Sequence, residues 1–295
     1  MKNTDGFVKE SPREIPVAAT VDVCVIGGSC TGVFAALRAA EAGMRVAIIE
    51  NNGFFGGTAT AGFVPVWHSR YSTDGEREII KGLTKQVLDR LVSIGEAVLR
   101  DRTNDSVYAY LNTAGLMVAL DEMISWNPLI RPFLHARFVA VAESSPHHPT
   151  HAIIEDKSGR RAIEAKFFID ASGDGDFLVR AGFETECLPA DQLQPHTTCA
   201  MLSGVDKVSA AHPDFSIGEM MKPKRGAGLK HVFQWTAPVI GSPSLTFSAM
   251  SRVQKCNPAD ADDLTAGEIE GRRQVTAIVR AANREFFTND AEVRV

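Results

Sequence analysis

The sequence has few cysteines, and they do not form the patterns that hold disulfides or metal ions. The five cysteines are an odd number and include no C-x-x-C pair; they are Cys24, Cys30, Cys187, Cys199 and Cys256. Disulfide scaffolds and structural zinc sites use even or clustered sets of cysteines. The cysteine content therefore predicts neither, and it favours a reducing compartment, the cytoplasm.

Long apolar runs and strong charge of one sign are also missing. No apolar run approaches the roughly 18 residues that cross a bilayer, and the first 17 residues are polar and lack a signal-peptide core. The net charge is −5, without a basic stripe. We therefore expect a small molecule as partner, and neither a membrane nor a nucleic acid. The oligomeric state stays open.

A histidine-rich stretch resembles a metal site only in its letters. His147, His148 and His151 follow an H-H-x-x-H pattern inside a proline-containing turn, with no carboxylate or cysteine beside them. We expect a solvated loop there and no metal.

A βαβ unit is predicted near the start of the chain. Val21–Ile26 and Arg45–Glu50 are short apolar runs typical of buried parallel strands. Between them, apolar residues recur with the spacing of one helix face, at Val33, Ala36, Leu37 and Ala40. Strand, glycine turn, helix and strand within 30 residues are typical of a dinucleotide-binding fold.

The turn in this unit departs from the G-x-G-x-x-G pattern at one place. Gly27 and Gly32 occupy the first and third glycine places, Ser29 the second, and Gly28 adds a glycine that we interpret as extra backbone freedom. Serine is small, and its hydroxyl can donate to a phosphate at the helix N-terminus. We interpret the site as modified but intact.

The acid at the end of the second strand supports dinucleotide binding. Glu50 lies where a carboxylate accepts hydrogen bonds from ribose hydroxyls and repels a 2′-phosphate, which argues against NADP. Two further glycine motifs, GFFGGTATAG and IDASGDGD, favour FAD over NAD. An NAD-dependent dehydrogenase and a non-catalytic or incomplete nucleotide-binding protein remain as alternatives.

Further elements are predicted along the rest of the chain. Helical spacing occurs at Ile80, Leu83, Val87, Leu88 and Leu91, and again from Leu116 to Ile124. Phe133–Ala142 is predicted as one strand, and a hairpin around the KSGR turn follows, with Ile163, Ala165, Phe167 and Ile169 facing inward. A T-x-x-E capping box at Thr265 and Glu268 predicts the start of a last helix, with its stripe at Val275, Ile278, Val279, Ala282 and Phe286.

These motifs make the chain similar to FAD-dependent oxidoreductases of the glutathione-reductase-like superfamily. The resemblance is to the large FAD-dependent oxidoreductase family, whose members often carry the label putative xanthan lyase. It implies an α/β fold: a three-layer FAD/NAD(P)-binding Rossmann-like domain with a β-meander, and a smaller, mainly β substrate region. We expect an FAD-binding domain over 1–188, a substrate or cap region over 189–263, and a helix over 264–295 that returns to the FAD-binding domain.

The resemblance also implies a set of site residues. The pyrophosphate would contact the turn, the adenosine ribose the end of the second strand, and the ribityl chain and flavin the second glycine motif. The backbone of one aromatic residue would meet the adenine, and the third motif would close the pyrophosphate side. In that order these are Gly27, Gly28, Ser29, Cys30, Thr31 and Gly32; Glu50 and Asn51; Gly57, Thr58 and Ala59; Phe138; and Ala171, Gly173 and Asp174.

The predicted reaction is hydride transfer between a small organic substrate and the flavin. Such a reaction needs a base and a group that orients the substrate. His68 is the best-placed candidate base and Arg70 could orient an anion, while His196 and His231 are weaker candidates. A structural or surface role for each histidine stays open.

We predict that FAD is bound without a covalent link, because neither glycine motif contains an obvious attachment residue. Denaturing the purified protein should release a yellow pigment that is identified as FAD. Flavin that stays with the polypeptide would contradict the prediction, and NAD as the sole nucleotide would contradict the cofactor.

We also expect the 295-residue chain to behave as a C-terminally truncated flavoprotein. No glycine follows Gly271, so the last glycine turn beside the flavin that the resemblance implies is missing from this sequence. FAD should therefore bind weakly and support little turnover. A titration that gives tight, stoichiometric binding with substrate-dependent flavin reduction would rule this out.

Overall fold

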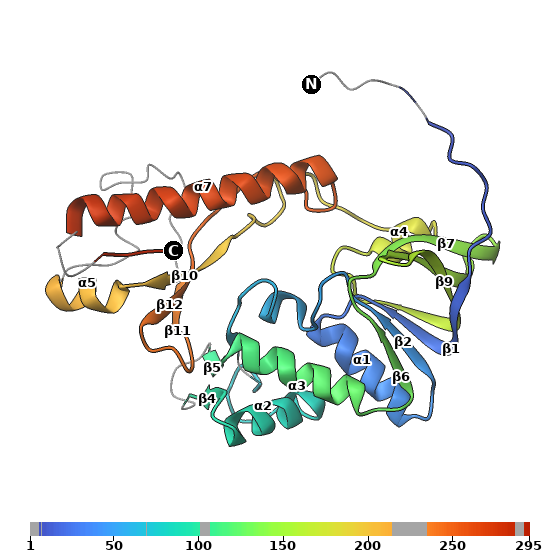
Figure 1. Ribbon diagram of the computed structural model, residues 1–295. Helices are drawn as coiled ribbons and strands as arrows, with labels where there is room; N and C mark the ends of the chain where they lie inside the picture. Colours follow the sequence, from blue (N-terminus) through green and yellow to red (C-terminus); the bar gives the residue numbers. More distant parts are fainter. Residues whose placement is uncertain (1–5, 7, 69, 101–106, 214–234, 287–291) are drawn as a thin grey trace.

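The computed structural model describes residues 6, 8–68, 70–100, 107–213, 235–286 and 292–295. Figure 1 shows a sheet with helices packed beneath it, and a long helix that lies over a smaller antiparallel sheet. The mixed α/β class predicted from the sequence is confirmed. In the part of the chain that is described, no helix is long and apolar enough to cross a membrane.

The predicted βαβ unit is present. It consists of β1 (Val17–Ile26), α1 (Cys30–Glu41) and β2 (Val46–Ile49). The two strands are parallel, with Ile26 opposite Ile49, and every residue of β2 is buried. The predicted helix stripe is buried as well, at Val33, Ala36, Leu37 and Ala40. A strand covered on both faces explains the unbroken apolar run in the sequence.

The main sheet has six strands in the order β6-β2-β1-β9-β8-β7. β6, β2, β1 and β9 are parallel, and β8 and β7 continue the sheet antiparallel. The added strands are β6 (Ile130–Phe133), β7 (Arg137–Ser145), β8 (His148–Asp156) and β9 (Gly159–Asp170). Across the sheet, the pairing therefore changes from parallel to antiparallel between β9 and β8.

The single strand predicted over Phe133–Ala142 is wrong. The structure divides it into β6 and β7, which lie at opposite edges of the sheet. The break has a local cause, because His135 has a left-handed backbone (φ +50°) that a strand does not tolerate. Pro132 sits in β6 without a donor for the ladder, which is acceptable on an edge strand.

The β7–β8–β9 hairpins differ in two details from the predictions. The strands extend into the predicted exposed loop, so that β7 ends at Ser145 and β8 begins at His148. Ile163 and Ala165 are buried as predicted, but Phe167 is 61% exposed. Phe168 packs inward in its place, stacked on Phe177 at 4.9 Å between ring centroids.

Helices cover one face of the parallel strands. α1, α2 (Leu83–Ser93) and α3 (Thr113–Ser125) share one apolar cluster with residues of β1 and β2. α2 begins at Leu83, after Gly82 with φ +66°, so Ile80 lies outside the helix and is exposed. The other face packs against β7, β8 and α4 (Asp176–Arg180) in a separate cluster. The sheet is thus covered on both sides.

Smaller strands form two antiparallel sheets. One has the order β3-β5-β4 and the other β10-β12-β11. Helix α5 follows β10 in the chain. Their bounds are β3 Val66–His68, β4 Ala97–Leu99, β5 Val107–Leu111, β10 Cys199–Ser203, α5 Val205–Ala211, β11 Trp235–Pro238 and β12 Leu245–Ala249. A 3-10 turn, η1 (Gly57–Ala59), lies in the second glycine motif.

The last helix, α7 (Ala261–Phe286), packs its predicted apolar stripe against β10 and α5. The stripe therefore belongs to the core of the small β region, whereas the sequence suggested a return to the FAD-binding domain. Only the start of α7 comes near the main sheet, where Leu264 lines a cavity described below. The domain boundaries at 188 and 263 stay predictions.

The start of α7 also corrects the predicted capping box. The helix begins four residues before Thr265, whose hydroxyl donates to the carbonyl oxygen of Ala261 at 2.8 Å inside the first turn. Asp260 is the actual cap, since its Oδ1 accepts from the backbone N–H groups of Asp262 (3.0 Å) and Asp263 (2.9 Å). A short acid before the helix satisfies the free N–H groups better than a threonine inside it.

We predict that Asp260→Ala lowers the free energy of unfolding by about 1 kcal/mol, the usual cost of losing an N-cap. Thr265→Ala, the matched control in the same turn, should stay within about 0.5 kcal/mol of the parent. Urea unfolding followed by circular dichroism measures both. If Thr265→Ala lowered the free energy of unfolding more than Asp260→Ala, Thr265 would be the N-cap that the sequence predicted.

Candidate cofactor site

The glycine turn between β1 and α1 is set by close backbone contacts. Gly27 has φ +99°, and a Cβ there would lie 2.3 Å from the carbonyl oxygen of Ala171, at the end of β9. A Cβ on Gly32 would lie 1.9 Å from the carbonyl oxygen of Gly27. No side chain fits at either position. The first and third glycine places of the motif are therefore required by packing in this chain.

Gly28 has a different role from the one expected. Its backbone is not in the left-handed region, so the residue is not needed for conformational freedom. A Cβ there would lie 2.5 Å from Cδ1 of Phe55 and 2.8 Å from Cβ of Glu50. Gly28 is thus the point at which the turn touches the buried Phe55 and the acid, a contact that the sequence did not indicate.

Ser29 is the N-cap of α1. Its Oγ accepts from the backbone N–H of Gly32 at 3.3 Å, which leaves the hydroxyl hydrogen able to donate to another group. The N–H groups of Cys30 and Thr31 follow in the first turn, where no intrahelical acceptor exists. The middle place of the motif therefore adds one hydroxyl donor to the positive end of a helix.

Cys30 is not a reactive thiol. Burial raises the pKa of its thiol to about 11, and Sγ donates to the carbonyl oxygen of Gly56 at 3.6 Å. The helix N-terminus does not offset this burial. The residue fills the turn as a small, partly buried side chain.

Glu50 is 6% exposed and points back into the glycine turn. Its Oε2 accepts from the backbone N–H of Gly28 at 2.8 Å, and its Oε1 accepts from N (2.7 Å) and Nδ2 (2.8 Å) of Asn52. A carboxylate has about four acceptor positions, so further hydrogen bonds remain possible. The acid therefore holds the turn and the end of β2 together in addition to any role toward a ligand.

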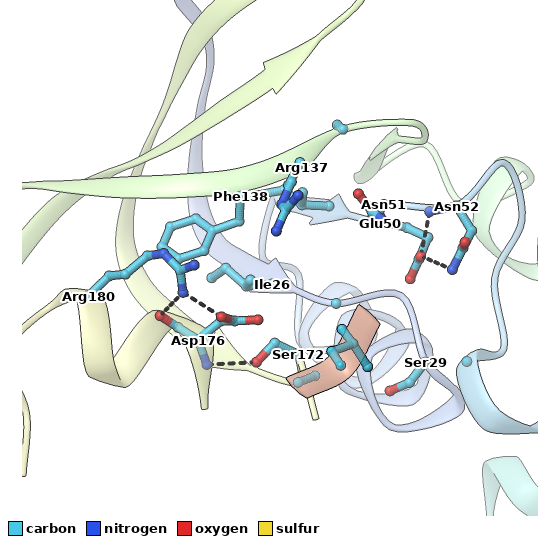
Figure 2. A pocket seen from close by; sticks show the side chains of 16 residues that line it. Ile26, Ser29, Glu50, Asn51, Asn52, Arg137, Phe138, Ser172, Asp176 and Arg180 are labelled. Atoms are coloured by element: carbon cyan, nitrogen blue, oxygen red, sulfur yellow. Dashed lines mark hydrogen bonds and ion pairs between the residues drawn. The ribbon is translucent and has the colours of Figure 1, made fainter. Parts of the chain in front are cut away.

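A cavity of about 460 Å³ opens above the carboxyl ends of these strands. Figure 2 shows Glu50, Asn51 and Asn52 on the right of the view, Phe138, Asp176 and Arg180 on the left, and Ser172 and Ser29 along the lower side. Open α/β sheets bind ligands at this edge. Of the residues predicted from the sequence, the lining includes Gly27, Ser29, Glu50, Asn51, Gly57, Phe138 and Ala171.

A smaller cavity of about 230 Å³ shares Ser29 with the first. Its lining contains four further predicted residues, Cys30, Thr31, Thr58 and Ala59. Gly28 and Gly32 of the turn line neither cavity. Val64, Val66 and Trp67 form an apolar part of the wall. The two cavities thus meet at the N-terminus of α1.

Two predicted residues of the third glycine motif line neither cavity: Gly173 and Asp174. Burial, and after it the nearby charge of Asp176, raise the pKa of the Asp174 carboxyl. The neighbouring Asp170 organises this loop: it accepts from Ser172 Oγ at 2.6 Å and from the backbone N–H groups of Phe177 and Leu178. That bonding holds Ser172 at the cavity.

Five polar lining residues were missed from the sequence: Asn52, Arg137, Ser172, Asp176 and Arg180. Arg180 makes an ion pair with Asp176, four residues earlier on α4, and its guanidinium lies 5.7 Å from the ring centroid of Phe138. The i, i+4 spacing of acid and arginine was a usable signal. Arg137 directly precedes Phe138, which the resemblance assigned to the adenine, so its place in the sequence was a usable signal as well.

The predicted catalytic pair lines neither cavity. His68 is exposed at the end of β3, one residue after Trp67. Arg70 is buried, and its Nη1 lies 3.0 Å from Oε1 of Glu78 in an ion pair. A guanidinium held by a neighbouring acid is a structural feature of the 70–78 segment. Because Arg70 is paired with Glu78 and lines neither cavity, its position does not support the predicted role of binding an anionic substrate.

Comparisons with known proteins agree with this geometry. A model of the family described as FAD dependent oxidoreductase matches residues 22–291. Thiamine thiazole synthase of Aeropyrum pernix is 29% identical over 197 residues, which cover 65% of this chain and 67% of that protein.

Two solved structures share the fold at low sequence identity. p-Nitrophenol 4-monooxygenase of Pseudomonas putida has a TM-score of 0.52 at 13% identity over 94% of this chain. A geranylgeranyl bacteriochlorophyll reductase-like protein of Thermoplasma acidophilum has a TM-score of 0.52 at 15% identity over 93% of this chain. The chain spans 66% and 65% of the lengths of these two structures.

The family model covers nearly the whole chain and includes the glycine turn, the acid after β2 and both cavities. The chain belongs to the FAD dependent oxidoreductase family, a family of enzymes whose cofactor is FAD.

Proposed function

We propose that the chain binds FAD across the two cavities that meet at Ser29, and that it transfers a hydride between a small organic substrate and the flavin. The observation that carries the proposal is the position of the α1 N-terminus at the junction of a polar cavity and a smaller, partly apolar one. A dinucleotide with a charged centre and two different ends matches this arrangement.

The junction is suited to the pyrophosphate. Ser29 offers a hydroxyl donor beside the first-turn N–H groups of α1. Gly57 has φ +54°, and a Cβ there would lie 2.9 Å from Cβ of Ser29, so a side chain would enter the junction. Because Gly27 and Gly57 have no side chain, a phosphate can approach the backbone closely at both positions.

The polar cavity is suited to adenosine. Glu50 keeps acceptor positions for ribose hydroxyls, and its charge disfavours the 2′-phosphate of NADP. Phe138 and the guanidinium groups of Arg137 and Arg180 line the opposite end, where they can contact a flat, neutral base. The family match supports FAD against the alternative of an NAD-dependent dehydrogenase.

The smaller cavity is suited to the flavin end. Thr58 and Ala59 give a narrow wall of small side chains, and Val66 and Trp67 an apolar one that excludes water from that side. When bound, FAD supplies a ring that accepts or donates a hydride. The role of His68 as a base stays a prediction, and its exposed position beside Trp67 supports proton exchange with solvent at most.

The state of the cysteines suggests the cellular compartment of the protein. All five are free, and Cys24 and Cys256 are buried. Free buried thiols are usual in a reducing compartment, so we infer a cytoplasmic protein.

We predict that Ser29→Gly keeps FAD and Gly32→Val loses it. Glycine is nearly as good an N-cap as serine, at a cost of a few tenths of a kcal/mol. Valine cannot fit where even a Cβ would meet the oxygen of Gly27, and overpacking costs about 1–3 kcal/mol or more. The ratio of flavin to protein after identical purification is the measurement. Equal loss in both variants would mean that the turn does not hold the cofactor.

The placement of the flavin end can be tested through tryptophan emission. The chain has three tryptophans, and only Trp67 lines the smaller cavity. FAD titration should quench the emission, and Trp67→Phe should remove most of this effect. The control is Trp126→Phe, because Trp126 is 67% exposed at the end of α3. If the two variants change the quenching equally, the flavin does not lie beside Trp67.

A further inference from the structure

A further cavity of about 640 Å³ lies beyond the loop that follows η1. The six-residue segment 58–63 contributes Thr58 and Ala59 of η1 to the proposed flavin end and then Ala61–Phe63 of the loop to this cavity. β10 and α7 supply the other walls. The cavity shares no residue with the two that the proposed FAD site uses, yet the same six-residue segment borders both.

One wall of the cavity is apolar and contains a strained aromatic residue. Phe63 has φ +55°, a left-handed backbone that is rare for a bulky side chain, and it is 46% exposed. This backbone closes the turn after η1, in which the N–H of Phe63 donates to the carbonyl oxygen of Thr60 and the N–H of Val64 to that of Thr58, both at 3.1 Å. The turn leaves the side chain of Phe63 in the cavity wall. Met201 and Val275 line the same space. Together the three side chains can hold an apolar body.

The polar wall comes from one face of α7. Glu268, Arg272 and Thr276 follow one another at four-residue spacing and all line the cavity. Nη1 of Arg272 donates to Oε2 of Glu268 at 2.7 Å. The wall therefore carries a donor group and an acceptor group side by side, and their charges cancel.

The ion pair favours a ligand group that can both accept and donate a hydrogen bond. A guanidinium has five N–H donors, so Arg272 can bind Glu268 and a ligand oxygen together, and Glu268 keeps free acceptor positions. An alcohol can accept from Arg272 and donate to Glu268. A carboxylate ligand can only accept, so it can bind Arg272 but cannot donate to Glu268.

We propose that this cavity binds the substrate and that the substrate is a neutral alcohol with an apolar, ring-sized body. The inference rests on the proposed function for the redox role, and it adds the substrate class. The alcohol oxygen lies at the Glu268–Arg272 pair, and the apolar body lies against Phe63, Met201 and Val275.

Benzyl alcohol and benzoate are matched probes for this proposal, since they differ in the polar group and share the ring. Saturation-transfer NMR on the 295-residue chain, with FAD added, gives the two dissociation constants. We expect benzyl alcohol to bind about tenfold more tightly than benzoate, the effect of one hydrogen bond to a charged group. Equal affinity, tighter benzoate binding or no binding of benzyl alcohol would overturn the proposal.

Glu268→Gln tests the assigned groups. Removing the negative charge leaves Arg272 without its ion pair, so the preference should move toward benzoate by about tenfold or more. Glu270→Gln is the matched control. Glu270 lies two residues after Glu268, pairs with Arg273, and does not line the cavity. A shift of the same size in both variants would assign the effect to the helix rather than to the cavity.

Phe63→Ala tests the apolar wall separately. It should weaken both probes equally, since the ring is common to them, and leave the ratio of their dissociation constants unchanged. No change in either affinity would remove Phe63 from the site and overturn the proposal.

The same measurements without FAD separate the two proposals. Alcohol binding at this cavity uses no residue of the proposed FAD site, so it should persist in the Gly32→Val variant, provided that circular dichroism shows the fold intact. If FAD fails to bind while benzyl alcohol still shows the charge preference, the proposed function fails and the cavity assignment stands. Loss of the preference with FAD retained gives the opposite result.

Discussion

The contact between the glycine turn and the end of β9 is the constraint on which the site depends. The backbone of Gly27 lies so close to Ala171 that a Cβ would reach 2.3 Å from its carbonyl oxygen, and Gly32 closes the turn from the helix side. This packing brings the N-terminus of α1 against the carboxyl ends of β1 and β9. Because of it, the free N–H groups of a helix open into a cavity and not into a core.

The second glycine motif is tied to this turn by direct contacts. The backbone N–H of Gly56 donates to the carbonyl oxygen of Gly28 at 2.8 Å, and Ser29 and Gly56 form a parallel bridge. Phe55 is buried against Gly28, and Glu50 accepts a hydrogen bond from the backbone N–H of the same residue. The turn, the acid and the loop after β2 are therefore one structural unit, and a change in any of them would be felt at the junction of the two cavities.

The loop after η1 joins the cofactor region to the rest of the chain. Thr58 and Ala59 of η1 line the smaller cavity, and Ala61–Phe63 of the loop line the cavity under α7. α7 is held by its apolar stripe on β10 and α5, so its polar face is free to form a wall. The small β region and α7 therefore contribute side chains by packing from outside, without interrupting the βαβ unit.

The sequence alone determined the features that depend on local periodicity and on glycine. The βαβ unit, the α1 stripe and the acid after β2 were all readable because a buried parallel strand and an amphipathic helix impose their own residue patterns. Tertiary structure decided what depends on distant backbone contact. Gly28 is needed because Phe55 lies against it, and Arg137 reaches the site because His135 turns the chain across the sheet. The pairing of Arg70 with Glu78 and the packing of α7 on β10 and α5 also depend on which residues become neighbours in the fold. Local sequence patterns do not indicate these neighbours.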